Sequence, residues 1–247
     1  MTAEHITALK QLWREAFGDP MSVIDAFFAV GFSPSRCNML LEDDQPVSAL
    51  YWFDCQLDGH RLAYLYAVAT AKSHRNRGLA HRLMEDTHRL LADQGYAGVI
   101  LVPGTPELFA LYRSLGYRTA TAVTECVTAW GDAPVRLTEV DAVTYSQLRK
   151  GFLPAGSVLQ EEETLAYLQT QSQFYAGNDF LLAASAEGNT LCAQEFLGNP
   201  NAIPGILRTL QLPTGRFRMP GPGRDFAMFL PLQNNCPVPS YFGLALD

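Results

Sequence analysis

The sequence predicts an α+β protein built from two units. Apolar residues recur at helical spacing in several segments, and short apolar or alternating runs between them predict strands. A segment with Gly and Pro at 131–134 separates two stretches of this kind, so we expect one domain over 1–131 and another over 134–247. With 48% apolar and 17% charged residues, the composition is that of a folded globular chain.

The first domain is expected to alternate helices and strands. Helical spacing and stop signals predict helices over 3–17, 22–30, 77–94 and 106–116. Strands are expected over 38–42, 46–55, 62–69, 97–102 and 117–130. Because short polar turns join the first three strands, they are expected to form an antiparallel meander.

The second domain repeats this α+β character without a comparable motif. We expect a helix entry at 138–141 and helices over 161–174 and 202–210. Strands are expected over 180–186, 190–196, 216–219, 226–230 and 241–246, the first two as a hairpin.

Composition disfavours several classes of partner and location. The net charge of −7, with no basic stripe, argues against nucleic acid. No apolar run is long enough to span a membrane, and the N-terminus reads as an amphipathic helix and not as a signal, so a cytoplasmic protein is expected. Five scattered cysteines without a C-x-x-C pair predict reduced thiols and no metal site. A homo-oligomer is compatible with the sequence, which does not fix the oligomeric state.

The most informative segment is a basic loop that joins a strand to the clearest helix. The first turn of a helix has N–H groups without intrahelical partners, and an anion can accept several of them. Gly78 and Ala80 leave room for a pyrophosphate, and Arg75 and Arg77 add guanidinium donors. Such a loop is often only a solvated surface, but the strand–loop–helix context favours phosphate binding.

The strand before this loop carries small residues at Ala67 and Ala69. A flat strip of alanine lets an extended ligand lie against the strand and bond its main chain. The strand is therefore expected to hold a long amide-bearing cofactor arm.

Two segments together resemble the GNAT (Gcn5-related N-acetyltransferase) superfamily. Its motif A, Arg/Gln-x-x-Gly-x-Gly/Ala after a strand, is matched by residues 75–80. Its motif B, a short helix with a tyrosine that ends in Gly-Phe or Gly-Tyr, is matched by 107–117 with Tyr112. The resemblance covers about residues 1–130 and implies the GNAT acyl-CoA N-acyltransferase fold, a mixed, mostly antiparallel sheet flanked by helices. A second, reduced GNAT-like domain would follow.

The resemblance implies acetyl-CoA, or another acyl-CoA, as co-substrate and a small-molecule or peptide amine as acceptor. Backbone groups of the strand would hold the pantetheine and thioester, at Val68, Ala69 and Thr70. Amides that begin the helix would hold the pyrophosphate, from Asn76 through Arg77, Gly78, Leu79 and Ala80 to His81. Tyr112 would lie near the sulfur as general acid.

The chemistry makes these roles reasonable. An amine attacks a thioester only when neutral, so a base or a water path must take its proton. A free strand N–H can stabilise the oxyanion, and the departing thiolate benefits from a proton that Tyr112 could supply. The alternative for Tyr112 is that it only continues the apolar stripe of Leu108, Leu111 and Leu115.

The base is the missing part, because residues 62–70 contain no carboxylate. The two-domain organisation suggests the bacterial tandem-GNAT branch, distantly similar to Eis-type acetyltransferases, which resemble each other in using their own C-terminal carboxylate. Asp247 is therefore the candidate base, anchored by the terminal strand. Tyr64, Tyr66 and a water chain remain open.

Three other signals are read as structural. The turn at 219–224 contains prolines without N–H donors and precedes a strand, so it is not a phosphate loop. His81 and His88 lie about 10.5 Å apart along a helix, too far to share a zinc ion, and are expected at the surface. The aromatic run at 51–53 is expected in the core, which requires both sheet faces to be covered, although it could line an acceptor pocket.

The leading function is acyl transfer to an amine by direct attack, without a covalent enzyme intermediate. The alternatives are aminoacyl transfer by tandem GNAT-like folds and a non-catalytic acyl-CoA-binding regulatory or scaffold protein. The absent strand glutamate supports the second alternative. The sequence identifies neither the acceptor nor the acyl chain length.

Overall fold

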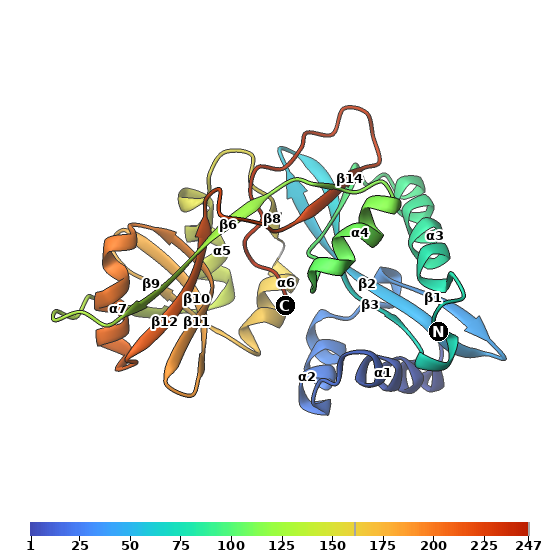
Figure 1. Cartoon of the computed structure of the whole chain (residues 1–247), viewed down its shortest axis with the longest axis horizontal. Coiled ribbons are helices and arrows are strands. Elements are labelled where there is room, and N and C mark those ends of the chain that lie inside the picture. The colour runs from blue at the N-terminus through green and yellow to red at the C-terminus, as the bar shows by residue number, and fades with distance from the viewer. Residues whose placement is uncertain (161, 247) are drawn as a thin grey trace. The chain divides into compact units, whose positions relative to one another are not determined.

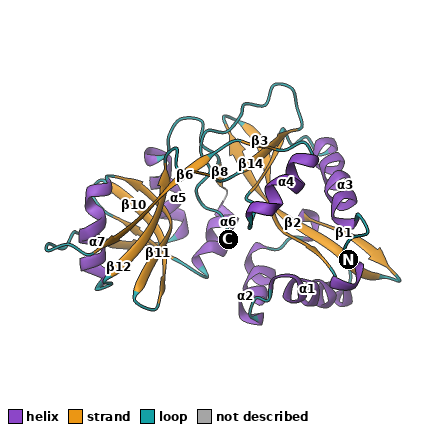
Figure 2. Ribbon diagram, in the orientation of Figure 1, coloured by secondary structure: helices purple, strands orange, loops and turns teal. Residues whose placement is uncertain are grey.

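The computed structural model describes residues 1–160 and 162–246, which form two compact units (Figures 1 and 2). Unit 1 comprises Met1–Arg118 with Met228–Val238, and unit 2 comprises Thr119–Ala227 with the residues from Pro239 onward. Within the described residues, none of the helices has the length and hydropathy needed to cross a membrane.

The units divide the chain differently from the expected boundary at 131–134. The strand expected over 117–130 is interrupted, and its main part, β6 (Ala122–Ala129), belongs to the sheet of unit 2 through antiparallel pairing with β12 (Thr214–Pro220). Conversely, β14 (Met228–Pro231) pairs with β4 (Gly98–Leu101) in the sheet of unit 1. Pairing with a strand distant in sequence is invisible to local periodicity, which explains the difference.

Unit 1 has the expected order of elements. Its helices are α1 (Ala3–Phe17), α2 (Met21–Ala26), α3 (Leu79–Asp93) and α4 (Pro106–Ser114), and a π-helical turn, Phe27–Gly31, follows α2. The strands β1 (Cys37–Glu42), β2 (Gln45–Leu57) and β3 (His60–Thr70) form the expected antiparallel meander. The sheet continues from β3 to β4, which is parallel to it, and then to β14.

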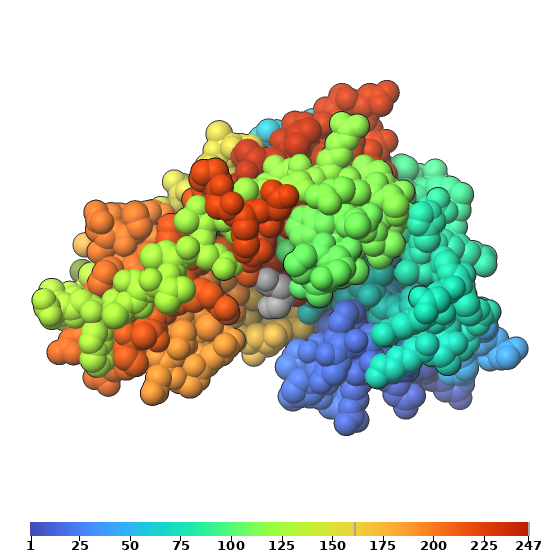
Figure 3. Space-filling view, in the orientation of Figure 1, coloured from blue at the N-terminus to red at the C-terminus, as the bar shows by residue number. Residues whose placement is uncertain are grey.

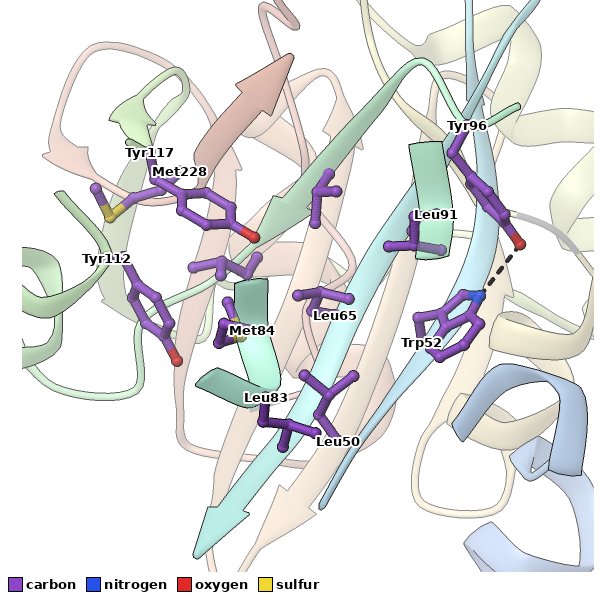
Figure 4. Close-up of a cluster of buried hydrophobic side chains, with 13 residues drawn as sticks. Leu50, Trp52, Leu65, Leu83, Met84, Leu91, Tyr96, Tyr112, Tyr117 and Met228 are labelled. Atoms are coloured by element: carbon purple, nitrogen blue, oxygen red, sulfur yellow. Dashed lines mark hydrogen bonds between the residues drawn. The ribbon is translucent and has the colours of Figure 1, made fainter. Parts of the chain in front are cut away.

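The aromatic run of β2 lies in the core, as expected. Trp52 packs in a cluster on one face of the sheet with side chains of α3, and its Nε1 donates to the Tyr96 hydroxyl at 3.1 Å (Figure 4). Tyr51 points to the other face, where its ring centroid lies 5.5 Å from that of Trp13 in α1 and 5.0 Å from that of Phe27. Both faces of β2 are therefore covered.

Unit 2 repeats the order of unit 1. In its described residues, helices α5 (Ala142–Phe152) and α6 (Glu162–Gln169) precede strands β9 (Gln173–Ala176), β10 (Phe180–Glu187) and β11 (Thr190–Gly198). Helix α7 (Ile203–Leu210) then leads to β12, which is parallel to β11 as β4 is to β3. The sheet order is β13 (Arg224–Asp225), β6, β12, β11, β10, β9 and β7 (Thr138–Val140). The β10–β11 hairpin is confirmed.

Two expectations for unit 2 are wrong. The helix expected over 161–174 ends at Gln169, because its last part turns into β9, and residue 161 lies outside the described residues. The terminal strand expected over 241–246 is absent from the described tail, where only Tyr241 forms a bridge, with Ser157. Side chains hold this tail in place of a strand ladder.

A buried ion pair fastens the tail to unit 2. The Arg149 guanidinium donates to both carboxylate oxygens of Glu195, at 2.6 and 2.8 Å, and neither side chain is more than 2% exposed. The hydroxyls of Tyr145 and Tyr241 each donate to the same carboxylate at 3.1 Å. Four charge-assisted hydrogen bonds therefore satisfy a carboxylate that would otherwise be costly to bury.

Removing one partner of this ion pair should strongly destabilise the protein. Because Glu195→Gln leaves the Arg149 charge buried without its counter-ion, we expect a loss of about 3–5 kcal/mol in the free energy of unfolding. Denaturant titration measures it, with Glu85→Gln as the control, since the His81–Glu85 pair is exposed and worth about 1 kcal/mol or less. Equal losses in both variants would contradict the expected role of the buried pair.

His88 should make stability depend on pH. Contrary to the expected surface position, its ring is half-buried and its Nε2 lies 2.7 Å from the Tyr117 hydroxyl. Burial lowers the pKa of His88 to about 4. The unfolded chain, with a pKa near 6.5, therefore binds the proton first as pH falls. Stability should decrease by roughly 1–2 kcal/mol between about pH 6.5 and 4, after allowance for solvent screening.

Chemical denaturation of the wild type and of His88→Gln across this range measures that dependence. The substitution should remove this part of the slope, because glutamine does not titrate. A variant with the same pH dependence as the wild type would show that His88 contributes nothing to it.

Candidate functional site

In unit 1, two neighbouring parallel strands, β3 and β4, part after a short paired segment. β3 pairs with β4 only from Leu62 to Tyr64, whereas its pairing with β2 continues to Thr70. Among the described residues, the edge of β3 on the β4 side thus has no strand partner beyond Tyr64. Its backbone N–H and C=O groups there are open to a ligand with an extended amide chain.

A β-bulge lies in this open segment. Ala67 has φ 51°, and the residues Ala67 and Val68 together face Leu50 of β2, since Tyr66 pairs with Tyr51 and Ala69 with Ala49. A left-handed conformation costs a non-glycine residue about 1–2 kcal/mol, and bulges are frequent beside active sites. The sequence analysis missed this bulge, because alanine is not typical of that conformation.

Polar contacts from β2 fix the end of β3. The Ser48 hydroxyl donates to the Ala69 carbonyl at 2.9 Å and lies 2.8 Å from the Thr70 hydroxyl. The Ala71 N–H donates to the Val47 carbonyl at 2.9 Å. The strand is thus held from one side, and its other edge stays open.

The loop after β3 presents the start of α3. The helix begins at Leu79, two residues later than expected, because Gly78 takes a left-handed conformation with φ 73°. No side chain caps this end, so the first-turn amides of Leu79, Ala80 and His81 lack the usual side-chain acceptor. No atom lies within 4 Å of where a Gly78 Cβ would stand. The loop and helix start, in teal, lie at the surface of unit 1 (Figure 3).

The two arginines of the loop are held by exposed contacts. The Arg77 guanidinium pairs with Glu42 at 2.8 and 3.3 Å, and His74 approaches the same carboxylate at 3.2 Å. The Arg75 Nε donates to the Thr70 carbonyl at 3.2 Å. Exposed pairs are worth little, so a phosphate could displace them. The pairing of Glu42 with Arg77 could not be predicted from the sequence, because the two residues lie 35 positions apart.

Tyr112 lies at the same hydrophobic cluster as the open strand. Its side chain is 8% exposed, and its ring centroid lies 5.8 Å from that of Tyr117 (Figure 4). Val68 packs against this cluster, as do Leu108 and Leu115. Burial raises the pKa of Tyr112 to about 12, so its hydroxyl keeps its proton at neutral pH. Tyr112 therefore both packs in the apolar cluster and carries a hydroxyl that is protonated at neutral pH.

Of the other candidates for the base, the structure places Tyr64 and Tyr66 but not Asp247. Tyr64 is buried, with its ring stacked on Phe53 at 6.4 Å, and the half-buried Tyr66 contacts Trp13 at 5.3 Å. Both belong to the aromatic cluster that packs on α1. Asp247 lies outside the described residues.

Comparison with known proteins identifies the fold. Residues 1–120 match the family model of the acetyltransferase (GNAT) domain, whereas no curated protein matches the sequence. The structure is similar to a GCN5-related N-acetyltransferase from Kribbella flavida, with a TM-score of 0.70, 17% identity and coverage of 94% of this chain and 71% of that one.

Two further structures are similar in fold. Eis1 from Mycobacterium abscessus matches with a TM-score of 0.65 and 13% identity over 94% of this chain and 72% of that one. A tandem GNAT protein from the clavulanic acid biosynthesis pathway matches with a TM-score of 0.55 and 10% identity over 94% of this chain and 96% of that one. Residues 1–120 therefore belong to the GNAT family of acetyltransferases, within a chain whose α+β fold resembles that of tandem GNAT proteins.

Proposed function

We propose that this protein is an N-acetyltransferase that moves the acetyl group of acetyl-CoA to a primary amine by direct attack. One observation carries the proposal. Over residues 65–81, an open strand edge, a bulge and an uncapped helix start follow one another along the chain. A diphosphate suits the helix start, and an amide-bearing arm suits the strand edge.

Different groups of the chain would bind the pyrophosphate and the pantetheine of the co-substrate. The backbone N–H groups from Asn76 to His81 would donate to the pyrophosphate oxygens, with Arg75 and Arg77 turning toward it from their exposed contacts. Backbone groups of Val68, Ala69 and Thr70 would bond the pantetheine and the thioester. A longer acyl chain remains an alternative to acetyl.

The same strand would assist the reaction. A free N–H on the open edge of β3 would stabilise the oxyanion as the amine adds to the thioester carbonyl. Tyr112 would donate its proton to sulfur as the carbon–sulfur bond breaks. Because its pKa of about 12 exceeds that of an ordinary thiol, near 8.5, its hydroxyl would hydrogen-bond the sulfur as negative charge develops, and transfer would be completed only as the proton released by the amine returns to the phenolate.

The acceptor amine must lose a proton, and we propose the carboxylate of Asp247 as its base. The absence of Asp and Glu from β3 leaves the strand without one, as the sequence shows. The buried Glu195 cluster fixes the tail at Tyr241, which gives the last residues a defined starting point. Tyr64, Tyr66 or a water chain would serve if Asp247 does not.

We assign binding to the N-terminal domain and propose that the C-terminal half is a reduced GNAT-like domain without co-substrate. Pro200 lies in the connection from β11 to α7 and Pro204 in the first turn of α7, and both lack N–H groups where a phosphate would need them. The acceptor would be a small-molecule or peptide amine. The free cysteines among the described residues fit a reducing cytoplasm, which we propose as the location.

Acetyl-CoA should stabilise the protein against heat, by about 2.7 kcal/mol at a concentration of 100 times Kd. Gly78→Val should abolish most of this gain, because valine is strained at the left-handed φ of 73° and would also crowd the phosphate site, whereas Gly104→Val, at an open position without a left-handed backbone, should not. Thiol release with a panel of amines then measures turnover. Absence of stabilisation contradicts the proposal. Binding without turnover favours a regulatory or scaffold protein, which the missing strand carboxylate also supports.

Tyr112→Phe should lower kcat by about 100-fold and leave the affinity for acetyl-CoA nearly unchanged. The reason is that phenylalanine keeps the ring in the cluster but has no proton to give. Steady-state thiol release and calorimetry measure the two quantities, with Tyr175→Phe in unit 2 as the control. An unchanged kcat would reduce Tyr112 to a member of the apolar stripe.

Deletion of Asp247 should lower kcat by about 100-fold and flatten the acidic limb of its pH–rate profile. Asp247→Asn tests the side-chain carboxylate of this residue separately from deletion. An unchanged profile after deletion would exclude Asp247 and direct attention to Tyr64, Tyr66 and water.

A further inference from the structure

Unit 2 contains a pocket that the proposed reaction does not use. Its volume is about 360 Å³, within the range of small-molecule sites. Charged and polar side chains of five neighbouring strands line it, chiefly Glu125, Glu187, Cys192, Arg216, Arg218 and Arg224.

The strand register explains why three arginines meet there. Arg216 and Arg218 are two positions apart on β12, so both project from one face of the sheet, while Phe217 between them is buried in the core on the other face. On the neighbouring strands, Cys192 of β11 pairs with Arg216, and Glu125 of β6 pairs with Arg218. The arginines are therefore placed by the sheet and not by a mobile loop.

A carboxylate and a ring orient two of these arginines. Glu125 accepts from Arg224 at 2.6 and 3.1 Å and lies 3.9 Å from the Arg218 Nε. The guanidinium carbons of Arg218 and Arg224 lie 4.6 and 5.2 Å from the centroid of the buried Phe226 ring. Hydrogen bonds to Arg224 hold the pKa of Glu125 below its usual range, so its charge persists.

Arg216 is differently placed. Its guanidinium makes no ion pair with the described residues, and its one hydrogen bond, from Nη2 to the Cys192 sulfur, is long at 3.8 Å. Burial raises the pKa of that thiol, so it does not supply a negative charge at neutral pH. The pocket thus holds three guanidinium groups and two carboxylates, and Arg216 has fork-shaped donors to spare.

We propose that this pocket binds a small organic anion through its carboxylate or phosphate group, with Arg216 as the principal donor. The guanidinium fork of Arg216 would donate hydrogen bonds to two oxygens of the anion, and Arg218 would add positive charge beside them. Glu125 and Phe226 hold the arginines close together in advance, which lowers the ordering cost of binding. The site is independent of acetyl transfer.

Titration of the full-length protein with succinate, citrate and inorganic phosphate at fixed ionic strength tests the proposal. Calorimetry and thermal unfolding should show saturable binding of at least one anion, and the pattern separates carboxylate from phosphate ligands. Arg216→Gln should weaken that binding by about tenfold or more. Arg136→Gln removes the same charge from an exposed position of unit 2 outside the pocket and should leave binding unchanged.

Two further variants keep the outcome unambiguous. Arg75→Gln tests whether the anion binds at the loop before α3 instead, and loss of binding in that variant but not in Arg216→Gln would overturn the proposal. Arg216→Lys keeps the charge without the fork, so an intermediate affinity is expected, and this variant decides if Arg216→Gln fails to fold. Absence of saturable binding by all three anions would also overturn it, whether or not acetyl-CoA binds.

Discussion

The parting of β3 from β4 after Tyr64 is the constraint on which the rest of unit 1 depends. Two parallel strands that stayed paired would satisfy each other's backbone groups and leave nothing for a ligand. The bulge at Ala67 and the Ser48 contacts hold β3 to β2 while its other edge is exposed. Helix α3 then starts directly after the loop, so the open strand edge and the open helix amides follow each other along the chain.

Local patterns in the sequence were sufficient for the elements of unit 1. The meander, the helix α3 and the core position of Trp52 follow from the alternation and period of apolar residues, and the structure confirms them. The family match over residues 1–120 likewise confirms a resemblance based on residues 75–80 and Tyr112. Local signals worked here because each describes contacts within one element or between neighbours in the chain.

Features that depend on distant partners could not be predicted in the same way. The exchange of β6 and β14 between sheets, the Arg77–Glu42 pair and the hydrogen bond of His88 each join segments far apart in sequence. The terminal strand failed for a related reason. Apolar alternation over 241–246 resembled a strand, but hydrogen bonds from Gln160 and to Glu195 hold the tail instead.

The two units share an order of elements but differ at the positions proposed to bind the co-substrate. Both place a helix between two parallel strands, yet the turns before these helices differ. Gly78 opens α3 in a left-handed conformation with bare amides, whereas Pro200 and Pro204 remove N–H groups at the start of α7. Under the proposed function, a few backbone positions would therefore decide which unit binds a diphosphate. In unit 2 the charged groups gather instead on the sheet, where side chains and not backbone amides would bind an anion.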